Sequence, residues 1–183
     1  WCQKHQTTAE IIVNDWAMAD LLTDFPQLRP ILGVLINKRR KDPRLSYKKG
    51  ELSDLSENSI NTDFYRNFLS KTCRITRYEW ESCGYLPELP EGKHSLHLPF
   101  YQTNTSQYCP LYARCKRGSR GAQTLPKDCP HWCSEYAFLY PAHLHMIGRY
   151  NSLFALDTGI LRSPELLDKW LKEGVDRLVV NLL

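Results

Sequence analysis

Four of the seven cysteines in this chain stand close together in the sequence. They form two pairs, Cys109-Pro-Leu-Tyr-Ala-Arg-Cys115 and Cys129-Pro-His-Trp-Cys133, with thirteen residues between the pairs. Thiolates are soft ligands that select zinc or iron–sulfur clusters, and short gaps allow one loop to surround a single inorganic centre. The segment therefore predicts a metal-binding site built from the four thiols.

The spacing inside the pairs bears on which metal is bound. Structural zinc usually takes pairs with about two to four intervening residues, whereas five residues separate Cys109 from Cys115. This difference favours a 4Fe-4S cluster and leaves zinc as the alternative. Disulfides or free thiols are the third interpretation, although an odd number of cysteines and a chain of this length argue against a disulfide framework.

Histidines offer a second source of ligands or of a general base. The candidates are His94, His97, His131, His143 and His145. His143 and His145 would share one side of an extended segment, but no carboxylate stands at a matching spacing, so surface or loop positions are the preferred interpretation. His131 lies between two predicted ligands and is expected to tune a cluster by hydrogen bonding.

Three cysteines lie outside the clustered pairs, namely Cys2, Cys73 and Cys83. Cys73 and Cys83 flank a predicted strand and are expected to be small buried apolar side chains. A Cys–His nucleophile would make the chain a cysteine peptidase. No pattern in the sequence places a thiol, a histidine and a carboxylate together, so a peptidase is the less favoured function.

Aromatic and basic residues surround the cysteine pairs. They are Tyr101, Tyr108, Tyr112, Trp132 and Tyr136, with Arg114, Lys116, Arg117 and Arg120. Such side chains can stack on bases and bind RNA, or they can exclude water from a cluster and offset its negative charge. A second basic run, Lys38–Arg44, is interpreted as a solvated loop, with contact to phosphate or another anion as the alternative.

Short strands and helices must position these residues. Runs of apolar and β-branched residues predict strands at Glu10–Asn14, Arg29–Ile36, Arg74–Trp80, Ser95–Tyr101, Ser152–Leu156 and Arg177–Asn181. Helical spacing and capping residues predict helices at Trp16–Phe25, from Thr62 or Asp63 to Leu69, and at Pro164–Lys172. The polar stretch between Asn37 and Asn61 is predicted to be a long loop.

Strands that alternate with helices and are apolar throughout predict parallel βα units. The expected class is α/β, as an incomplete part of a TIM-type (β/α) barrel, with an open doubly wound sheet as the alternative. No G-x-G-x-x-G or Walker-type loop supports a nucleotide-binding version. We expect residues 1–183 to form a single domain or a fragment of a barrel, with a cysteine-rich cluster-binding loop at residues 102–135.

Composition limits the remaining classes. The apolar content of 42% is enough for a core, and no apolar run is long enough for a membrane span. The start, Trp1-Cys2-Gln3-Lys4-His5, has neither an apolar signal core nor an initiator methionine, so we expect a cut or processed chain of a cytoplasmic protein.

Several segments resemble the collagenase-like peptidase family U thirty-two. They are Glu10–Trp16, Leu32–Lys38, Lys41-Asp42-Pro43-Arg44, the four clustered cysteines, and Gly174-Val175-Asp176-Arg177. The resemblance runs in order from about Glu10 to Asn181. The family includes proteins of ubiquinone synthesis and relatives that hydroxylate transfer or ribosomal RNA.

The resemblance implies a barrel-type fold, a 4Fe-4S cluster and oxygen-independent hydroxylation of RNA or a quinone precursor, with peptidase activity as an alternative. The cluster ligands would be Cys109, Cys115, Cys129 and Cys133. The chain is shorter than the usual barrel of the family. The remaining part of the barrel or a related subunit is therefore expected as a partner, and a non-catalytic interaction subunit stabilised by zinc or a cluster is a further alternative.

Overall fold

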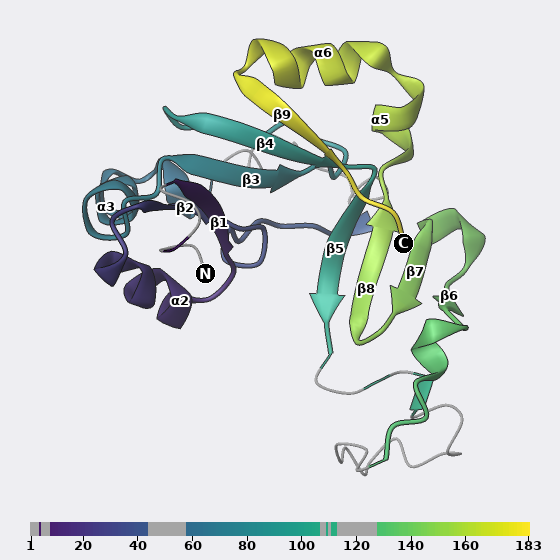
Figure 1. Cartoon of the computed structure of the whole chain (residues 1–183). Helices are drawn as coiled ribbons and strands as arrows, with labels where there is room; N and C mark the ends of the chain where they lie inside the picture. The colour runs from purple at the N-terminus through teal and green to yellow at the C-terminus, as the bar shows by residue number, and fades with distance from the viewer. Residues whose placement is uncertain (1–3, 5–7, 44–57, 107–108, 110, 113–127) are drawn as a thin grey trace.

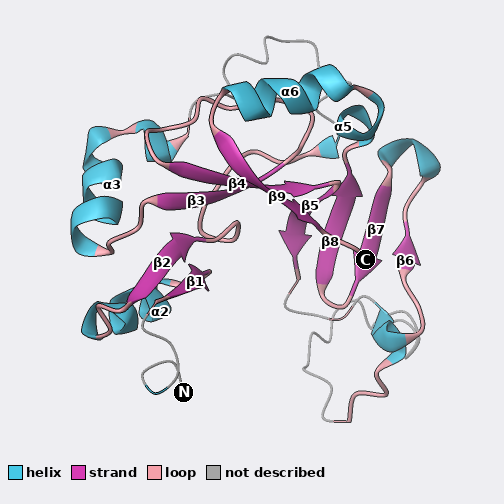
Figure 2. Cartoon of the chain, turned by 45° about the horizontal axis from the view of Figure 1, so that its top comes forward, coloured by secondary structure: helices cyan, strands magenta, loops and turns pink. Residues whose placement is uncertain are grey.

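Two sheets of different kinds build the fold (Figures 1 and 2). The computed structural model describes residues 4, 8–43, 58–106, 109, 111–112 and 128–183. The first sheet is parallel, with the strand order β1 (Ala9–Val13), β2 (Leu28–Leu32), β3 (Arg77–Glu81), β4 (Lys93–Leu98) and β9 (Val175–Val180). The second is antiparallel, with the order β5 (Phe100–Thr105), β8 (Ser152–Leu156), β7 (Met146–Arg149) and β6 (Phe138–Leu139).

Short helices connect and cover these strands. They are α2 (Trp16–Leu21), α3 (Asp63–Asn67) with its π-helical extension η5 (Phe68–Thr72), α5 (Thr158–Arg162) and α6 (Pro164–Lys172). Single 3₁₀ turns are η1 (Leu22–Asp24), η4 (Ser59–Asn61), η6 (Trp132–Ser134) and η7 (Ala142–Leu144). Figure 1 shows α6 on the outer side of β9, close to the start of that strand, and Trp170 of α6 is buried in the core.

The predicted TIM-type barrel of βα units is wrong. The strands that follow β4 and precede α5 in the chain form a four-stranded antiparallel sheet. In addition, the described helices are too few and too short for one to follow each strand. The predicted strand Ser95–Tyr101 is divided at Pro99, and its halves, β4 and β5, belong to different sheets. Proline has no N–H to donate to a strand ladder, so a break at this position is physically favoured.

Most of the other predicted elements are confirmed with shifted ends. The first strand, the helix after it and α6 match closely, and Asp15 caps α2 by accepting a hydrogen bond from the Met18 N–H at 2.7 Å. The second strand ends at Leu32, because the chain turns from Gly33 onward. Ser152–Leu156 is a strand as predicted, but its pairing is antiparallel.

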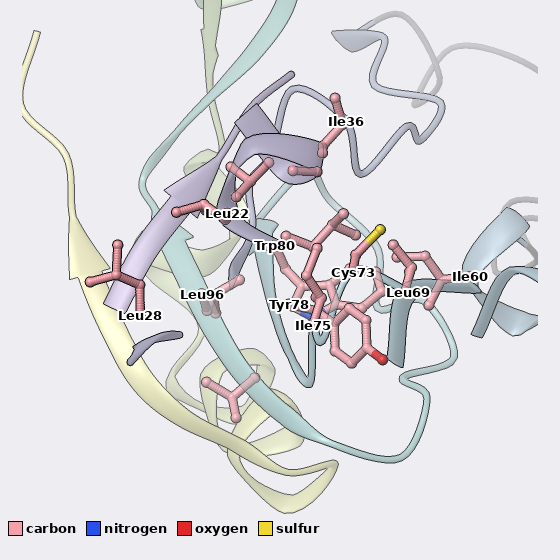
Figure 3. Packing of buried hydrophobic residues seen from close by; sticks show 14 of the residues in the cluster. Leu22, Leu28, Ile36, Ile60, Leu69, Cys73, Ile75, Tyr78, Trp80 and Leu96 are labelled. Carbon is pink, nitrogen blue, oxygen red and sulfur yellow. The ribbon is translucent and has the colours of Figure 1, made fainter. Parts of the chain in front are cut away.

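The main core lies between the helices and one face of the parallel sheet (Figure 3). Leu32, Tyr78, Trp80 and Leu96 supply it from the strands, and Ile60, Leu69 and Trp170 supply it from the helical segments. Cys73 also lies in this cluster as a buried free thiol, which confirms the prediction for that cysteine. Full burial of side chains of this size removes apolar surface from water, the main driving force of folding.

The opposite face of the parallel sheet carries charged side chains. Arg77 of β3 forms a bidentate ion pair with Asp176 of β9, at 2.6 and 2.8 Å. Glu10 of β1 accepts a hydrogen bond from Arg177 of β9 at 2.6 Å, although these strands form the two edges of the sheet. A contact between edge strands means that the sheet is strongly curved. The hydrogen bond to Arg77 lowers the pKa of Asp176.

His94 is buried in the core in its neutral form. Its Nδ1 accepts a hydrogen bond from the Trp80 indole N–H at 3.0 Å, and its Nε2 lies 2.9 Å from the Pro90 carbonyl oxygen, which fixes the proton on Nε2. Burial lowers the pKa of this imidazole. A role for His94 as a metal ligand is thus not supported, because both ring nitrogens have partners in the core.

The stability of the protein should fall as the pH decreases from 7 to 5. A histidine whose pKa is lowered in the folded state makes its full contribution to the stability of the fold above its ordinary pKa of about 6.5. This contribution is lost as the pH falls toward the lowered pKa, because the unfolded state then binds more protons. Urea unfolding at several pH values measures the effect. His94→Gln should flatten the slope, whereas His145→Gln, at an exposed histidine, should leave it unchanged. Equal slopes in all three proteins would contradict the assignment.

Candidate functional site

In the sequence, the clustered cysteines fall between β5 and β6. These two strands form the edges of the antiparallel sheet. Cys109 is half-buried, Cys133 is half-buried and Cys129 is exposed, while Cys115 lies outside the described residues. Much of the predicted loop 102–135 lies outside as well, including Tyr108, Arg114, Lys116, Arg117 and Arg120. Its first residues, from Gln102 to Thr105, belong to β5.

An aromatic contact joins the two halves of the cysteine segment. The Tyr112 ring lies against the Trp132 ring, with centroids 6.3 Å apart and planes tilted by 33°. Tyr112 follows Cys109, and Trp132 lies between Cys129 and Cys133. In addition, the Tyr112 N–H donates a hydrogen bond to Cys109 Sγ at 3.5 Å. Backbone donors of this kind also hydrogen-bond the sulfur ligands of iron–sulfur clusters.

The turn at the second cysteine pair has a defined geometry. His131 adopts a left-handed conformation with φ of 56°, and its carbonyl oxygen accepts hydrogen bonds from the Ser134 N–H at 2.9 Å and the Ser134 hydroxyl at 2.7 Å. This turn places Cys133 on the 3₁₀ turn η6. The His131 side chain is exposed, and its role in tuning a cluster by hydrogen bonding stays a prediction.

The four-cysteine donor set fits a soft metal by its chemistry. Cys73, Cys83, Cys109, Cys129 and Cys133 are all free thiols, so the disulfide alternative finds no pair among the described cysteines. Among the residues that the structure describes, no three Cys, His, Asp or Glu side chains lie close enough together to hold a metal ion. The fourth predicted ligand, Cys115, is not among the described residues.

A mixed pocket of about 400 Å³ lies beyond the carboxyl ends of the parallel strands. Cys83, Tyr85, Tyr101, His143, His145 and Asp157 are among the residues that line it. This assembly of a thiol, two histidines and a carboxylate was not predicted from the sequence, because the residues come from four distant segments. The rule that ligands bind beyond the carboxyl ends of parallel strands was the available signal.

The geometry of the mixed pocket does not favour a cysteine nucleophile. Burial raises the pKa of the Cys83 thiol, although Arg39 Nη2 lies 3.3 Å from its sulfur. Both oxygens of Asp157 already accept backbone hydrogen bonds, from Gly84 on one oxygen and from Gly159 and Ile160 on the other, at 2.9 to 3.1 Å. Asp157 therefore caps α5 and ties it to the loop after β3, instead of orienting a histidine.

Cys83 should react slowly with iodoacetamide at pH 7.5, because a buried thiol with a raised pKa is rarely ionised. In metal-free protein, the exposed Cys129 should be alkylated at least about tenfold faster. Peptide mapping by mass spectrometry over time measures both rates. Faster alkylation at Cys83 than at Cys129 would indicate an activated thiol and would reopen the peptidase interpretation.

A second pocket, the basic pocket, has a volume of about 300 Å³ and lies between the segment after β2 and strand β5. The residues that give it its character are Asn37, Lys38, Arg39, Lys41, Gln102 and Thr103. A third pocket, of about 360 Å³, shares Lys41 and Thr103 with the basic pocket and Asp42, Pro43 and Leu144 with the mixed pocket. The three pockets adjoin one another along residues 37–43.

Two charged contacts hold residues 37–43 in place. Lys41 pairs with Glu81 at the end of β3, and the other oxygen of Glu81 accepts a hydrogen bond from the Gln102 N–H at 2.7 Å. Arg39 lies over the rings of Tyr85, Trp80 and Trp170 at 4.9 to 5.9 Å. The interpretation of the basic run as a solvated loop is therefore wrong for Arg39 and Lys41, which are both partly buried.

Comparisons of this chain with protein-family models, with curated proteins and with solved structures found no match. The resemblance to peptidase family U thirty-two thus rests on sequence motifs alone. Within the described residues, no helix combines the length and apolar character needed to cross a membrane.

Proposed function

We propose that the chain is a cytoplasmic iron–sulfur protein that acts as an enzyme, or as a subunit of one, in the oxygen-independent hydroxylation of RNA or a quinone precursor. Its 4Fe-4S cluster would be held by Cys109, Cys115, Cys129 and Cys133. The observation that carries the proposal is the contact between Tyr112 and Trp132, which brings the segments of the two cysteine pairs together. Such a cluster supplies one-electron transfer when it is bound.

The surroundings of the cysteines support the same proposal. The hydrogen bond from Tyr112 to Cys109 Sγ is of the kind that tunes the reduction potential of a cluster. The two aromatic rings provide apolar surface that limits the access of water. Zinc is less well supported, because the gap between Cys109 and Cys115 is wider than structural zinc sites use.

We propose the mixed pocket as the place where an aromatic substrate group binds. Tyr85 and Tyr101 offer ring surfaces, and pockets of this volume accommodate small organic groups. We assign no catalytic residue. A related subunit is the proposed partner, and the exposed apolar side chains Leu178 and Val180 on the edge strand β9 are candidates for contact with it.

Deletion of the gene in the source organism tests the hydroxylation proposal. Hydroxylated RNA nucleosides and hydroxylated quinones, both measured by mass spectrometry, should include at least one product that disappears. Wild-type protein and the Cys73→Ala control should restore it, whereas Cys129→Ser should not. Full rescue by Cys129→Ser would contradict a cluster-dependent reaction, and cleavage of peptides by cluster-free protein would favour a peptidase.

A further inference from the structure

We propose that the basic pocket binds the oxyanion group, a phosphate or a carboxylate, of a small molecule that also carries a hydroxyl group. The inference does not depend on the metal centre or on hydroxylation. It concerns residues that the proposed reaction leaves without a role, namely the start of the basic run after β2 and the facing residues of β5.

The charge of the pocket selects an anion. Lys38, Arg39 and Lys41 line it, and no aspartate or glutamate does so among the described residues. Lys41 is paired with Glu81, but neither Lys38 nor Arg39 forms an ion pair within the described part of the chain. Among the described residues, Arg39 donates hydrogen bonds to the Glu81 carbonyl oxygen and the Cys83 sulfur, at 3.2 and 3.3 Å, and neither acceptor is a carboxylate that would neutralise its positive charge.

Two buried polar atoms on residues that line this pocket have no hydrogen-bond partner among the described residues. One is Arg39 Nε, a donor, and the other is Asn37 Oδ1, an acceptor. Asn37 is only 3% exposed, and its amide is held in one orientation because Nδ2 donates to the Glu79 carbonyl oxygen at 2.7 Å. Buried polar groups in native proteins almost always have partners, so an unpaired donor and acceptor in one pocket point to a bound group.

The two unpaired atoms define complementary features of the ligand. Arg39 Nε needs an acceptor, which an oxyanion supplies, and arginine is well suited to such groups. Asn37 Oδ1 needs a donor, which a hydroxyl beside the oxyanion supplies. The position is also the expected one for a parallel sheet, because ligands bind beyond the carboxyl ends of parallel strands, and Asn37 follows β2 by a few residues. The volume of about 300 Å³ suits a small molecule.

Calorimetric titration of the full chain at low salt tests the proposal with three probes. Glycerol 3-phosphate should bind saturably, and it should bind about fivefold more tightly than propyl phosphate, which lacks the hydroxyls. Glycerate, the carboxylate analogue, shows which oxyanion is preferred. Absence of saturable binding by both glycerol 3-phosphate and glycerate would overturn the proposal, and equal binding of the two phosphate esters would overturn its hydroxyl part.

A pair of charge reversals locates the site. Lys38→Glu, at an exposed lysine of the basic pocket, should weaken the binding of glycerol 3-phosphate or glycerate by at least about tenfold. Lys172→Glu, at an exposed lysine of α6 outside the pocket, should change it less than about twofold. Thermal unfolding should confirm that both variants fold. Equal weakening by both variants would show that binding reflects the overall charge and would overturn the assignment.

Discussion

Replacement of Cys129 by serine is expected to remove most of the iron and sulfide from protein purified without oxygen. A serine hydroxyl is a much poorer ligand for iron than a thiolate, and a cluster held by three cysteines exposes one iron to exchange. Iron, acid-labile sulfide and the visible absorption of the variant measure the loss. Cys129 is exposed, so the substitution should disturb the fold little.

Cys73→Ala is the matched control for this experiment. Cys73 is a free thiol in the apolar core, far from the predicted ligands in the sequence, and alanine keeps its apolar character. This variant should retain its iron and sulfide. If Cys129→Ser kept a full complement of both, or if the two variants lost them equally, the assignment of Cys129 as a ligand would be wrong.

Glu81→Gln is expected to lower the free energy of unfolding by about 3 kcal/mol, because it leaves a nearly buried lysine without its counter-charge. The side chains of Lys41 and Glu81 are only 12% and 7% exposed. The substitution should also loosen the attachment of residues 37–43 to β5, because Lys41 loses its ion pair with the side chain that accepts the Gln102 N–H. Urea unfolding measures the change.

Two further variants separate the ion pair from a general effect of the substitution. Lys41→Met combined with Glu81→Gln should recover more than half of the lost stability, because no unpaired charge then stays buried. Glu91→Gln, at an exposed glutamate, should change the free energy of unfolding by less than about 0.5 kcal/mol. A stability of Glu81→Gln equal to that of the wild type would mean that the pair is not formed in solution.

The local elements could largely be predicted from the sequence. The β-branched run before Asp15, the cap that Asp15 provides, and the proline-led helix α6 are local signals that the structure confirms. The second sheet could not be predicted in the same way. Phe138–Leu139 is too short to give a pattern, and the polar side chains of β5 do not resemble a buried strand. Pro99 was a local signal for a break, but one continuous strand, Ser95–Tyr101, was predicted through it, and the change of sheet was not foreseen.

The candidate sites also differ in how close together their residues lie in the sequence. The cysteine segment is local in sequence, so its chemistry could be predicted from spacing alone. The pockets are not local. Arg39 meets Cys83 because the neighbouring strands β2 and β3 bring the segments after them together. Asp157 joins Cys83 in the mixed pocket only when the chain returns from the second sheet. The burial of His94 also depends on its partners Trp80 and Pro90, and nothing in the sequence distinguishes it from the exposed His143.

Metal analysis of the wild-type protein, purified and handled without oxygen, tests whether the four clustered cysteines hold a 4Fe-4S cluster. We expect a brown protein with about four iron and about four acid-labile sulfide ions per chain, the stoichiometry of one such cluster. One zinc per chain without sulfide, or a protein that binds neither metal after reconstitution with iron and sulfide, would contradict it.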